Sequence, residues 1–203
     1  MIIVIDYNVG NVRSVCNAFR HIGFDAKLSC EPAEIEAADA LVLPGVAAFG
    51  YAMNALGGLA ETVKKVAGAD KPLLGICVGH QLLFERSCEH GKHKGLGLIL
   101  GDVVPIPPGR VIPHMGWNLV KLQQDMDLFA GLGGEKHFYF AHSFYADVKD
   151  ADAKIAYCDY GFNLTAAVHK GNIYGTQFHP EKSGSSGLKV LENFAQIAKR
   201  IKS

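Results

Sequence analysis

Three short apolar runs restrict the fold of this chain more than any other feature of its sequence. MIIVID (residues 1–6), ALVLPG (40–45) and PLLGIC (72–77) are almost continuously hydrophobic, and each ends in Gly or a polar residue. Such runs are typical of parallel strands buried on both faces of a sheet. Residues 11–22 and 49–67, which lie between the runs, carry apolar side chains at helical spacing. The β-α-β-α-β order predicts an α/β fold with a doubly wound, mostly parallel central sheet and flanking helices.

The second half of the chain has a different pattern. It contains shorter predicted strands separated by turns, which indicates an additional antiparallel portion, and residues 165–180 read as a hairpin that turns at 170–172. Apolar residues at helical spacing predict a helix close to the C-terminus. No linker, repeat or low-complexity region interrupts the chain, so residues 1–203 are expected to form a single domain. The predicted strands of this half are 97–106, 117–122, 136–148, 154–161 and 165–180.

Charge and cysteine content exclude several classes of protein. Lys and Arg number 20, Asp and Glu also number 20, and a zero net charge disfavours general attraction to nucleic acid. The start of the chain does not resemble a secretory signal, and no apolar run approaches the roughly 20 residues that span a bilayer. The five cysteines are scattered and never spaced C-x-x-C, which favours free thiols in a reducing cytoplasm. A cytoplasmic protein without a nucleic-acid or membrane partner is therefore expected.

The motif GICVGHQ (75–81) places Cys77 between two glycines at the end of a predicted strand. A strand that turns sharply into a helix starting near Gly79 describes a nucleophile elbow, in which the helix N-terminus favours a thiolate and offers N–H groups to an oxyanion. The alternative is that Cys77 is a small buried hydrophobe, as most free cysteines are. The motif by itself leaves both interpretations open.

A second motif, GTQFHPEKS (175–183), supplies the groups that a cysteine nucleophile requires. His179 follows a predicted strand and can act as general base, while Glu181 can accept the proton on the far nitrogen of the ring and fix its orientation. An isolated H-x-E pair is more commonly a surface feature. Together with the cysteine elbow, however, the pair predicts a Cys77–His179–Glu181 triad.

The two motifs, in this order and about 100 residues apart, resemble the class I glutamine amidotransferase family. The resemblance implies hydrolysis of the glutamine side-chain amide by Cys77, His179 and Glu181, without a metal or other cofactor. It also implies that the loop LPGVAAF (43–49) completes an oxyanion hole, with the backbone N–H groups of Val46 and Val78 as donors. The residues that would contact bound glutamine by the same resemblance are Pro44, Gly45, Gln81, Glu89, His142 and Ser143.

Further motifs resemble one branch of that family, the glutaminase subunits of imidazole glycerol phosphate synthase. They are DYNVGN (6–11), LPGVAAF, HKGLGLI (93–99), HMGWN (114–118), YFAHSF (139–144) and GTQFHPEKSG (175–184). The branch usually has Gly at the position of Ala47, beside the proposed oxyanion loop, and often Met at that of His80, for which no catalytic part is expected. The resemblance implies a heterodimer with a (β/α)8 cyclase subunit, which uses the ammonia to make imidazole glycerol phosphate and aminoimidazole carboxamide ribotide in histidine biosynthesis. The residues expected at that interface are Asn11, His114, Met115, Trp117, Asn118, Tyr139 and Lys182.

Three alternatives remain open from the sequence. A related amidotransferase subunit could feed ammonia to another acceptor, for instance in the amidination of a sugar. A non-enzymatic homologue could keep the fold and only dock a synthase, although the intact triad argues against it. A cysteine peptidase with a similar elbow fits the flanking motifs less well. Glu89, His90 and His93 lie close together in the sequence, but their loose, glycine-rich spacing favours a surface loop over a metal site.

Overall fold

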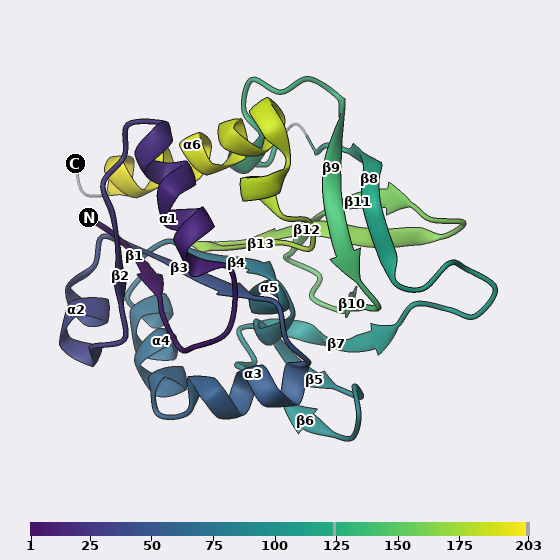
Figure 1. The fold of residues 1–203 in the computed structure, drawn as a ribbon, viewed down its shortest axis with the longest axis horizontal. Helices are drawn as coiled ribbons and strands as arrows, with labels where there is room; N and C mark the ends of the chain where they lie inside the picture. Colours follow the sequence, from purple (N-terminus) through teal and green to yellow (C-terminus); the bar gives the residue numbers. More distant parts are fainter. Residues whose placement is uncertain (124, 202–203) are drawn as a thin grey trace.

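The central element of the computed structural model is a nine-stranded mixed sheet (Figure 1). The structure describes residues 1–123 and 125–201, and of residue 201 only the backbone. The strand order is β2-β1-β3-β4-β13-β12-β11-β8-β9, and the first five strands run parallel to one another. These five strands are β1 (Ile2–Ile5), β2 (Ala26–Ser29), β3 (Ala40–Gly45), β4 (Leu73–Cys77) and β13 (Ile173–Thr176).

Helices cover both faces of the parallel strands, as their apolar sequences require. Figure 1 shows α1 and α6 on one side of these strands, with α2, α3 and α4 on the other. Residues 49–67, predicted as helical, form two helices because the chain takes a positive φ of 48° at Gly57 and turns there. The helices are α1 (Val12–His21), α2 (Pro32–Ala37), α3 (Phe49–Leu56), α4 (Leu59–Gly68), α5 (Val78–Leu82) and α6 (Gly184–Ile201).

The other half of the central sheet is antiparallel. From β13 outwards each neighbouring pair of strands is antiparallel, and the predicted hairpin of residues 165–180 is confirmed as β12 and β13. The strands of this half are β12 (Asn163–Lys170), β11 (Lys154–Asp159), β8 (His114–Lys121) and β9 (Glu135–His142). The predicted α/β fold with an additional antiparallel portion is therefore confirmed.

A second, four-stranded sheet lies beside the first, and its order is β10-β7-β5-β6. The single strand predicted over 136–148 is wrong, because the chain leaves the central sheet at Ser143 and continues as β10 in the second sheet. Continuous β-propensity gives no sign that the two ends of such a run pair with different partners. The strands of this sheet are β5 (Phe84–Ser87), β6 (His93–Lys94), β7 (Ile99–Pro105) and β10 (Phe144–Val148).

The core lies between the parallel strands and the helices that cover them. Every residue of β1, β3 and β4 is buried, as continuous apolar runs predict. In β8, by contrast, residues exposed to solvent alternate with more buried ones at the start of the strand, so that one face is open. None of the helices in the described part of the chain has the length and apolar character needed to span a bilayer.

Candidate active site

Cys77 lies at the point where β4 turns directly into α5. Its φ of 55° and ψ of −109° fall in a region that non-glycine residues rarely occupy, so the cysteine itself carries the strain of the turn. The flanking glycines serve another purpose, because neither has a positive φ. A Cβ at Gly79 would overlap the carbonyl oxygen of Leu43, and one at Gly75 would lie 2.6 Å from the carbonyl oxygen of Gly79. The glycines therefore permit close packing of α5 on the sheet, and α5 has only five residues.

His179 and Glu181 form a buried ion pair beside Cys77. His179 Nδ1 lies 2.9 Å from Glu181 Oε1, and the two side chains are 3% and 1% exposed. Burial works to lower the pKa of His179, but hydrogen bonds with Cys77 and Glu181 outweigh it and raise the pKa to about 10. The carboxylate can thus hold the ring through Nδ1 while Nε2 serves the thiol. Among the described residues, Glu181 Oε2 has no hydrogen-bond partner.

Two further groups approach the sulfur of Cys77, one from β9 and one from the residue that follows β13. Sγ lies 3.9 Å from the carbonyl oxygen of Ala141, and 3.9 Å from Nε2 of Gln177. Gln177 is the first residue after β13 and precedes His179 by two residues. Cys77 therefore stands at the end of β4, while Ala141 belongs to β9 and Gln177 directly follows β13.

The LPGVAAF loop continues β3 alongside the elbow. Gly45 pairs with Cys77 in the β3–β4 register, so Val46 and Val78 follow the two strands at the same edge of the sheet. Tyr7 donates a hydrogen bond from its hydroxyl to the carbonyl oxygen of Pro44 at a distance of 2.5 Å. Neither Val46 nor Ala47 has a positive φ, so the conformation adopted here accepts an alanine at position 47 without backbone strain.

A pocket of about 320 Å³ opens over the sulfur and has the size of a small-molecule site. Cys77, His179, Val46 and Val78 line it together with residues 141–144, where β9 ends and β10 begins. The proposed glutamine contacts Gln81, Glu89, His142 and Ser143 also line this pocket. Pro44 and Gly45 are the last two residues of β3 and precede the lining residue Val46.

Two of these pocket residues already have partners within the chain. Gln81 Nε2 donates to the carbonyl oxygen of Phe144 at 2.8 Å and to Gln177 Oε1 at 3.1 Å. Glu89 Oε2 accepts a hydrogen bond of 2.7 Å from the backbone N–H of Phe49, the first residue of α3. Glu89 thus stabilises the start of α3, where free N–H groups favour a carboxylate, and its other oxygen remains for a ligand.

The residues expected at a partner interface divide into exposed and buried groups. Met115 and Trp117 are 65% and 56% exposed on the open face of β8. Trp117 pairs with Tyr139 across the strands, and the Lys182 ammonium lies 5.8 Å from the centre of the Tyr139 ring. These four residues define an exposed patch beside the mouth of the pocket, which Met115 and Lys182 also line.

His114, which could be an interface residue or a packed residue of a turn by sequence, does not belong to this exposed patch. It is only 3% exposed, because alternation along β8 turns it to the face opposite Met115. Asn118 is half-buried on the same face and bonds to His114. Asn11 lies at the start of α1, where its side chain accepts a hydrogen bond from Ser14.

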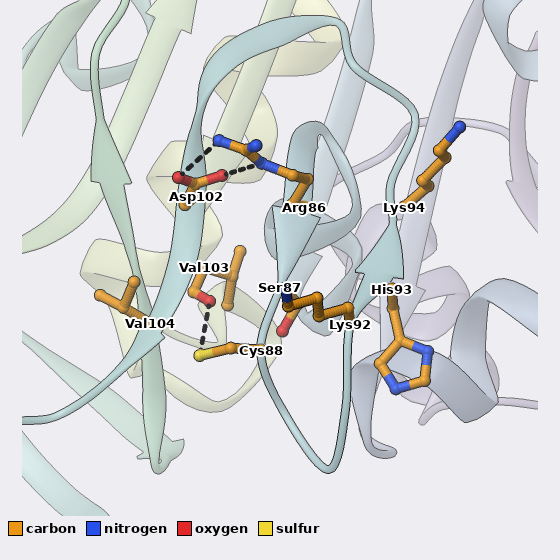
Figure 2. Close-up of a pocket in the computed structure, with 9 residues that line it drawn as sticks. All are labelled: Arg86, Ser87, Cys88, Lys92, His93, Lys94, Asp102, Val103 and Val104. Atoms are coloured by element: carbon orange, nitrogen blue, oxygen red, sulfur yellow. Dashed lines mark hydrogen bonds and ion pairs between the residues drawn. The ribbon is translucent and has the colours of Figure 1, made fainter.

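A larger pocket lies elsewhere, on the second sheet, and contains none of the proposed catalytic residues. Its volume is about 430 Å³, and Figure 2 shows Arg86 paired with Asp102 at one side and Cys88 bonded to the carbonyl of Val103. His93, which lies at its rim, packs against Gly50 of α3. Across the residues that the structure describes, no group of three His, Cys, Asp or Glu side chains is arranged to hold a metal ion.

Sequence reasoning assigned no role to two residues that contact the site, Gln177 and Tyr7. Gln177 could have been found from strand periodicity, because residues two apart in an extended chain share a face and Gln177 therefore accompanies His179. Tyr7 reaches the loop only through the pairing of β1 with β3, so no local signal marks it.

Comparisons with known proteins identify the family of this chain. The sequence-family model for class-I glutamine amidotransferases matches residues 3–198. The chain is 52% identical over 197 residues to the imidazole glycerol phosphate synthase subunit HisH of Methanothermobacter thermautotrophicus, covering 97% of this chain and 98% of that protein. It is 46% identical over 207 residues to the subunit HisH of Listeria innocua, covering 100% and 99% of the two chains.

Solved structures show the same fold at lower identity. A crystal structure described as a glutamine amidotransferase superposes with a TM-score of 0.79 at 19% identity, covering 98% of this chain and all of the other. The structure of PurLQS from Thermotoga maritima gives a TM-score of 0.77 at 22% identity, covering 97% of each chain. From the sequence matches, the chain belongs to the class-I glutamine amidotransferase family, and within it to the branch that includes the imidazole glycerol phosphate synthase subunits HisH.

Proposed function

We propose that this protein is the glutaminase subunit of an imidazole glycerol phosphate synthase in histidine biosynthesis. It hydrolyses glutamine to glutamate and ammonia, and residues 1–203 act as one amidotransferase domain in the cytoplasm. The observation that carries the proposal is the buried His179–Glu181 pair, with an Nδ1–Oε1 distance of 2.9 Å, beside the strained Cys77 at the base of a pocket. The proposal is also supported by sequence identities of 44% and 52% to two subunits HisH over nearly the whole chain.

In the first half of the reaction, the Cys77 thiolate attacks the side-chain amide carbon of glutamine. The carbonyl oxygen becomes an oxyanion, which accepts hydrogen bonds from the backbone N–H groups of Val46 and Val78. His179, whose raised pKa favours the imidazolium form, gives a proton to the amide nitrogen. The carbon–nitrogen bond breaks, ammonia leaves and a glutamyl thioester of Cys77 remains.

In the second half, neutral His179 takes a proton from a water molecule that attacks the thioester. The carbon–sulfur bond breaks, glutamate leaves, and the proton on His179 restores the starting pair with the thiolate. Glu181 holds the imidazole through Nδ1 in both halves. One oxyanion donor is typically worth about 100- to 1000-fold in rate, so the placement of the Val46 loop strongly affects turnover.

Side chains around the pocket suit the two ends of glutamine. His142, Ser143 and Gln81 line the pocket, and Pro44 and Gly45 end β3 immediately before the lining residue Val46. The free oxygen of Glu89 offers an acceptor for the substrate ammonium group. These contacts place the side-chain amide over Cys77.

The exposed patch of Met115, Trp117, Tyr139 and Lys182 is the proposed docking surface for a cyclase subunit. Large exposed apolar side chains with aromatic neighbours are typical of interfaces, and a lysine at the rim supplies a charge for an acidic residue of the partner. The patch borders the mouth of the pocket, so ammonia leaving Cys77 would enter the partner rather than solvent. The partner is proposed to be a (β/α)8 barrel in a heterodimer with this chain.

The direct test measures glutamate release by the purified chain, alone and with the candidate cyclase and its nucleotide substrate. We expect slow hydrolysis alone and a large acceleration by the loaded partner. Cys77→Ala should lower the rate by on the order of 10⁴-fold or more in both conditions, since removing a nucleophile removes the covalent route. Equal rates with and without the partner would refute the coupling. Full activity of Cys77→Ala would refute the triad.

A further inference from the structure

His114 and His142 form a buried pair that the proposed reaction does not use directly. They face each other in the register of β8 and β9, at the first residue of one strand and the last residue of the other. His114 Nδ1 lies 3.0 Å from His142 Nε2. The ring of His114 packs between Phe140 and Tyr160, with centroid distances of 4.5 and 4.1 Å.

Only one arrangement of protons satisfies every hydrogen bond of this pair when both rings are neutral. His142 Nδ1 lies 2.8 Å from the carbonyl oxygen of Phe144, which can only accept, so this nitrogen carries the proton. His142 Nε2 must then accept, and His114 Nδ1 must donate to it. The remaining nitrogen of His114, Nε2, accepts from the Asn118 amide at 3.3 Å, and Asn118 Oδ1 accepts from the N–H of Leu119.

Burial makes the neutral form of both rings the stable one near pH 7. It lowers the pKa of His114 to about 4. It also lowers the pKa of His142 to about 3, with smaller contributions from neighbouring histidines, although the bond to Phe144 works in the opposite direction. Both rings therefore hold a single proton on Nδ1, which is the less common tautomer of a free imidazole.

The chain of hydrogen bonds continues from this pair to the nucleophile. The Phe144 carbonyl that accepts from His142 also accepts from Gln81 Nε2, at 2.8 Å. Gln81 Nε2 bonds Gln177 Oε1, and Gln177 Nε2 lies 3.9 Å from Cys77 Sγ. The Phe144 carbonyl thus joins the wall of the pocket, at residues 142–144, to the amides that lie beside the sulfur.

We propose that His114 is a positioning residue for glutamine hydrolysis, which donates from Nδ1 to His142 and so holds the 142–144 wall of the pocket in place against Gln81 and Cys77. The inference rests on the proposed function, because it concerns the same pocket. Without this donor, His142 Nε2 would be a buried acceptor lacking a partner, and the ring would have to rotate or shift with its backbone. The wall that binds glutamine would move with it.

Two substitutions separate the hydrogen bond from the packing of the ring. His114→Phe keeps an aromatic ring between Phe140 and Tyr160 but has no donor, whereas His114→Asn loses the ring but places an amide donor near the position of Nδ1. In the complex with the cyclase, we expect His114→Phe to raise KM for glutamine roughly tenfold with a smaller change in kcat. His114→Asn should stay within about threefold of wild type. The opposite order would show that only ring packing matters and would overturn the proposal.

A second measurement needs no variant and no activity. The ¹⁵N NMR shifts of His114 and His142 in the wild-type protein at pH 7.5 should show a protonated Nδ1 and a bare Nε2 for both rings. A protonated Nε2 on either ring would overturn the proposal. Absence of glutamine hydrolysis by the wild-type complex would instead refute the proposed function, and it would leave this tautomer result unaffected.

Discussion

His80 and the His114–His142 pair are all buried and neutral, but they lie beside or within different halves of the central sheet. They also differ in their hydrogen bonds. His80 belongs to α5, next to the parallel strands, and both of its ring nitrogens lack a partner among the described residues. It packs edge-on against Phe84 and fills the space above Gly175. His114 and His142, at the antiparallel end, have a partner for all four nitrogens.

This difference shows what each half contributes. The parallel half is stabilised by apolar packing, and its glycines let α5 approach the sheet. A buried histidine there mainly fills space in the core. The antiparallel half brings polar side chains to one pocket wall, where each hydrogen bond fixes the direction of the next. Cys77 ends β4 and His179 follows β13, both strands of the parallel half, whereas residues 142 and 143 of the pocket wall and Met115, Trp117 and Tyr139 of the exposed patch belong to or follow the antiparallel strands β8 and β9.

Glu181, in the segment that follows β13, is expected to set the pKa of His179 through its negative charge. Glu181→Gln keeps an oxygen that can accept from His179 Nδ1 but removes the negative charge, so the pKa of His179 should fall. We expect kcat for glutamine to decrease by roughly 100-fold, because the imidazolium is no longer stabilised, with little change in KM. Steady-state kinetics across pH measure both effects. Glu192→Gln, on the surface of α6, is the matched control, and equal loss in both variants would contradict the prediction.

The comparison also predicts that the open face of β8 carries partner binding. Trp117→Ala should weaken the affinity for the cyclase by roughly 30-fold, the loss typical of an aromatic hot spot, without changing the thermal stability of the isolated chain. Titration of the labelled cyclase measures the affinity. Tyr51→Ala is the control, because Tyr51 is 64% exposed on α3, in the parallel half. If both variants bind equally well, the patch is not the docking surface.

The third prediction concerns the unpartnered ring of His80. His80→Met fills similar space without polar atoms, so we expect the free energy of unfolding at pH 7.5 to rise by about 1 kcal/mol. Burial lowers the pKa of His80 to about 3, below the ordinary value near 6.5. As the pH falls from 6.5 towards 3, His80 therefore binds a proton in the unfolded state but not in the folded state. The free energy of unfolding of the wild-type protein decreases over this range.

The gain from His80→Met should consequently grow by about 2 kcal/mol between pH 7.5 and pH 5.0, since each pKa unit corresponds to about 1.4 kcal/mol. Urea unfolding at the two pH values measures this difference. Leu82→Met, at another buried position of α5, removes no titratable group and should show no such growth. A gain independent of pH would mean that His80 is protonated or hydrated in the folded protein.

Much of the parallel half could be predicted from the sequence. The runs MIIVID, ALVLPG and PLLGIC became β1, β3 and β4 almost residue for residue, because full burial requires continuous apolar sequence. Prediction failed where a strand was short or where one apolar run contributed to two different sheets. No strand was predicted over Phe84–Ser87, which follows a five-residue helix, and the run 136–148 gave no indication that its two ends enter different sheets.

The candidate site was predicted in its residues more than in its geometry. Cys77, His179 and Glu181 lie together, and Gln81, Glu89 and His142 line the same pocket, while their contacts with glutamine stay a prediction. The strain at Cys77, the surroundings of its sulfur and the burial of His114 could not be read from motifs. Each depends on which strands are neighbours, and a motif does not specify neighbours distant in sequence.

The sequence by itself determined the order of strands and helices in the first half, the family and the groups proposed to react, because these depend on local periodicity and on short motifs. Only the tertiary structure decided how the halves meet. Pairing of β4 with β13 brings the strand that carries Cys77 beside the strand that leads to His179, and pairing of β8 with β9 makes His114 a hydrogen-bond donor to the pocket wall. Hydrogen bonds between residues 28 to 100 positions apart in the chain exist only once packing has placed their donors and acceptors within reach.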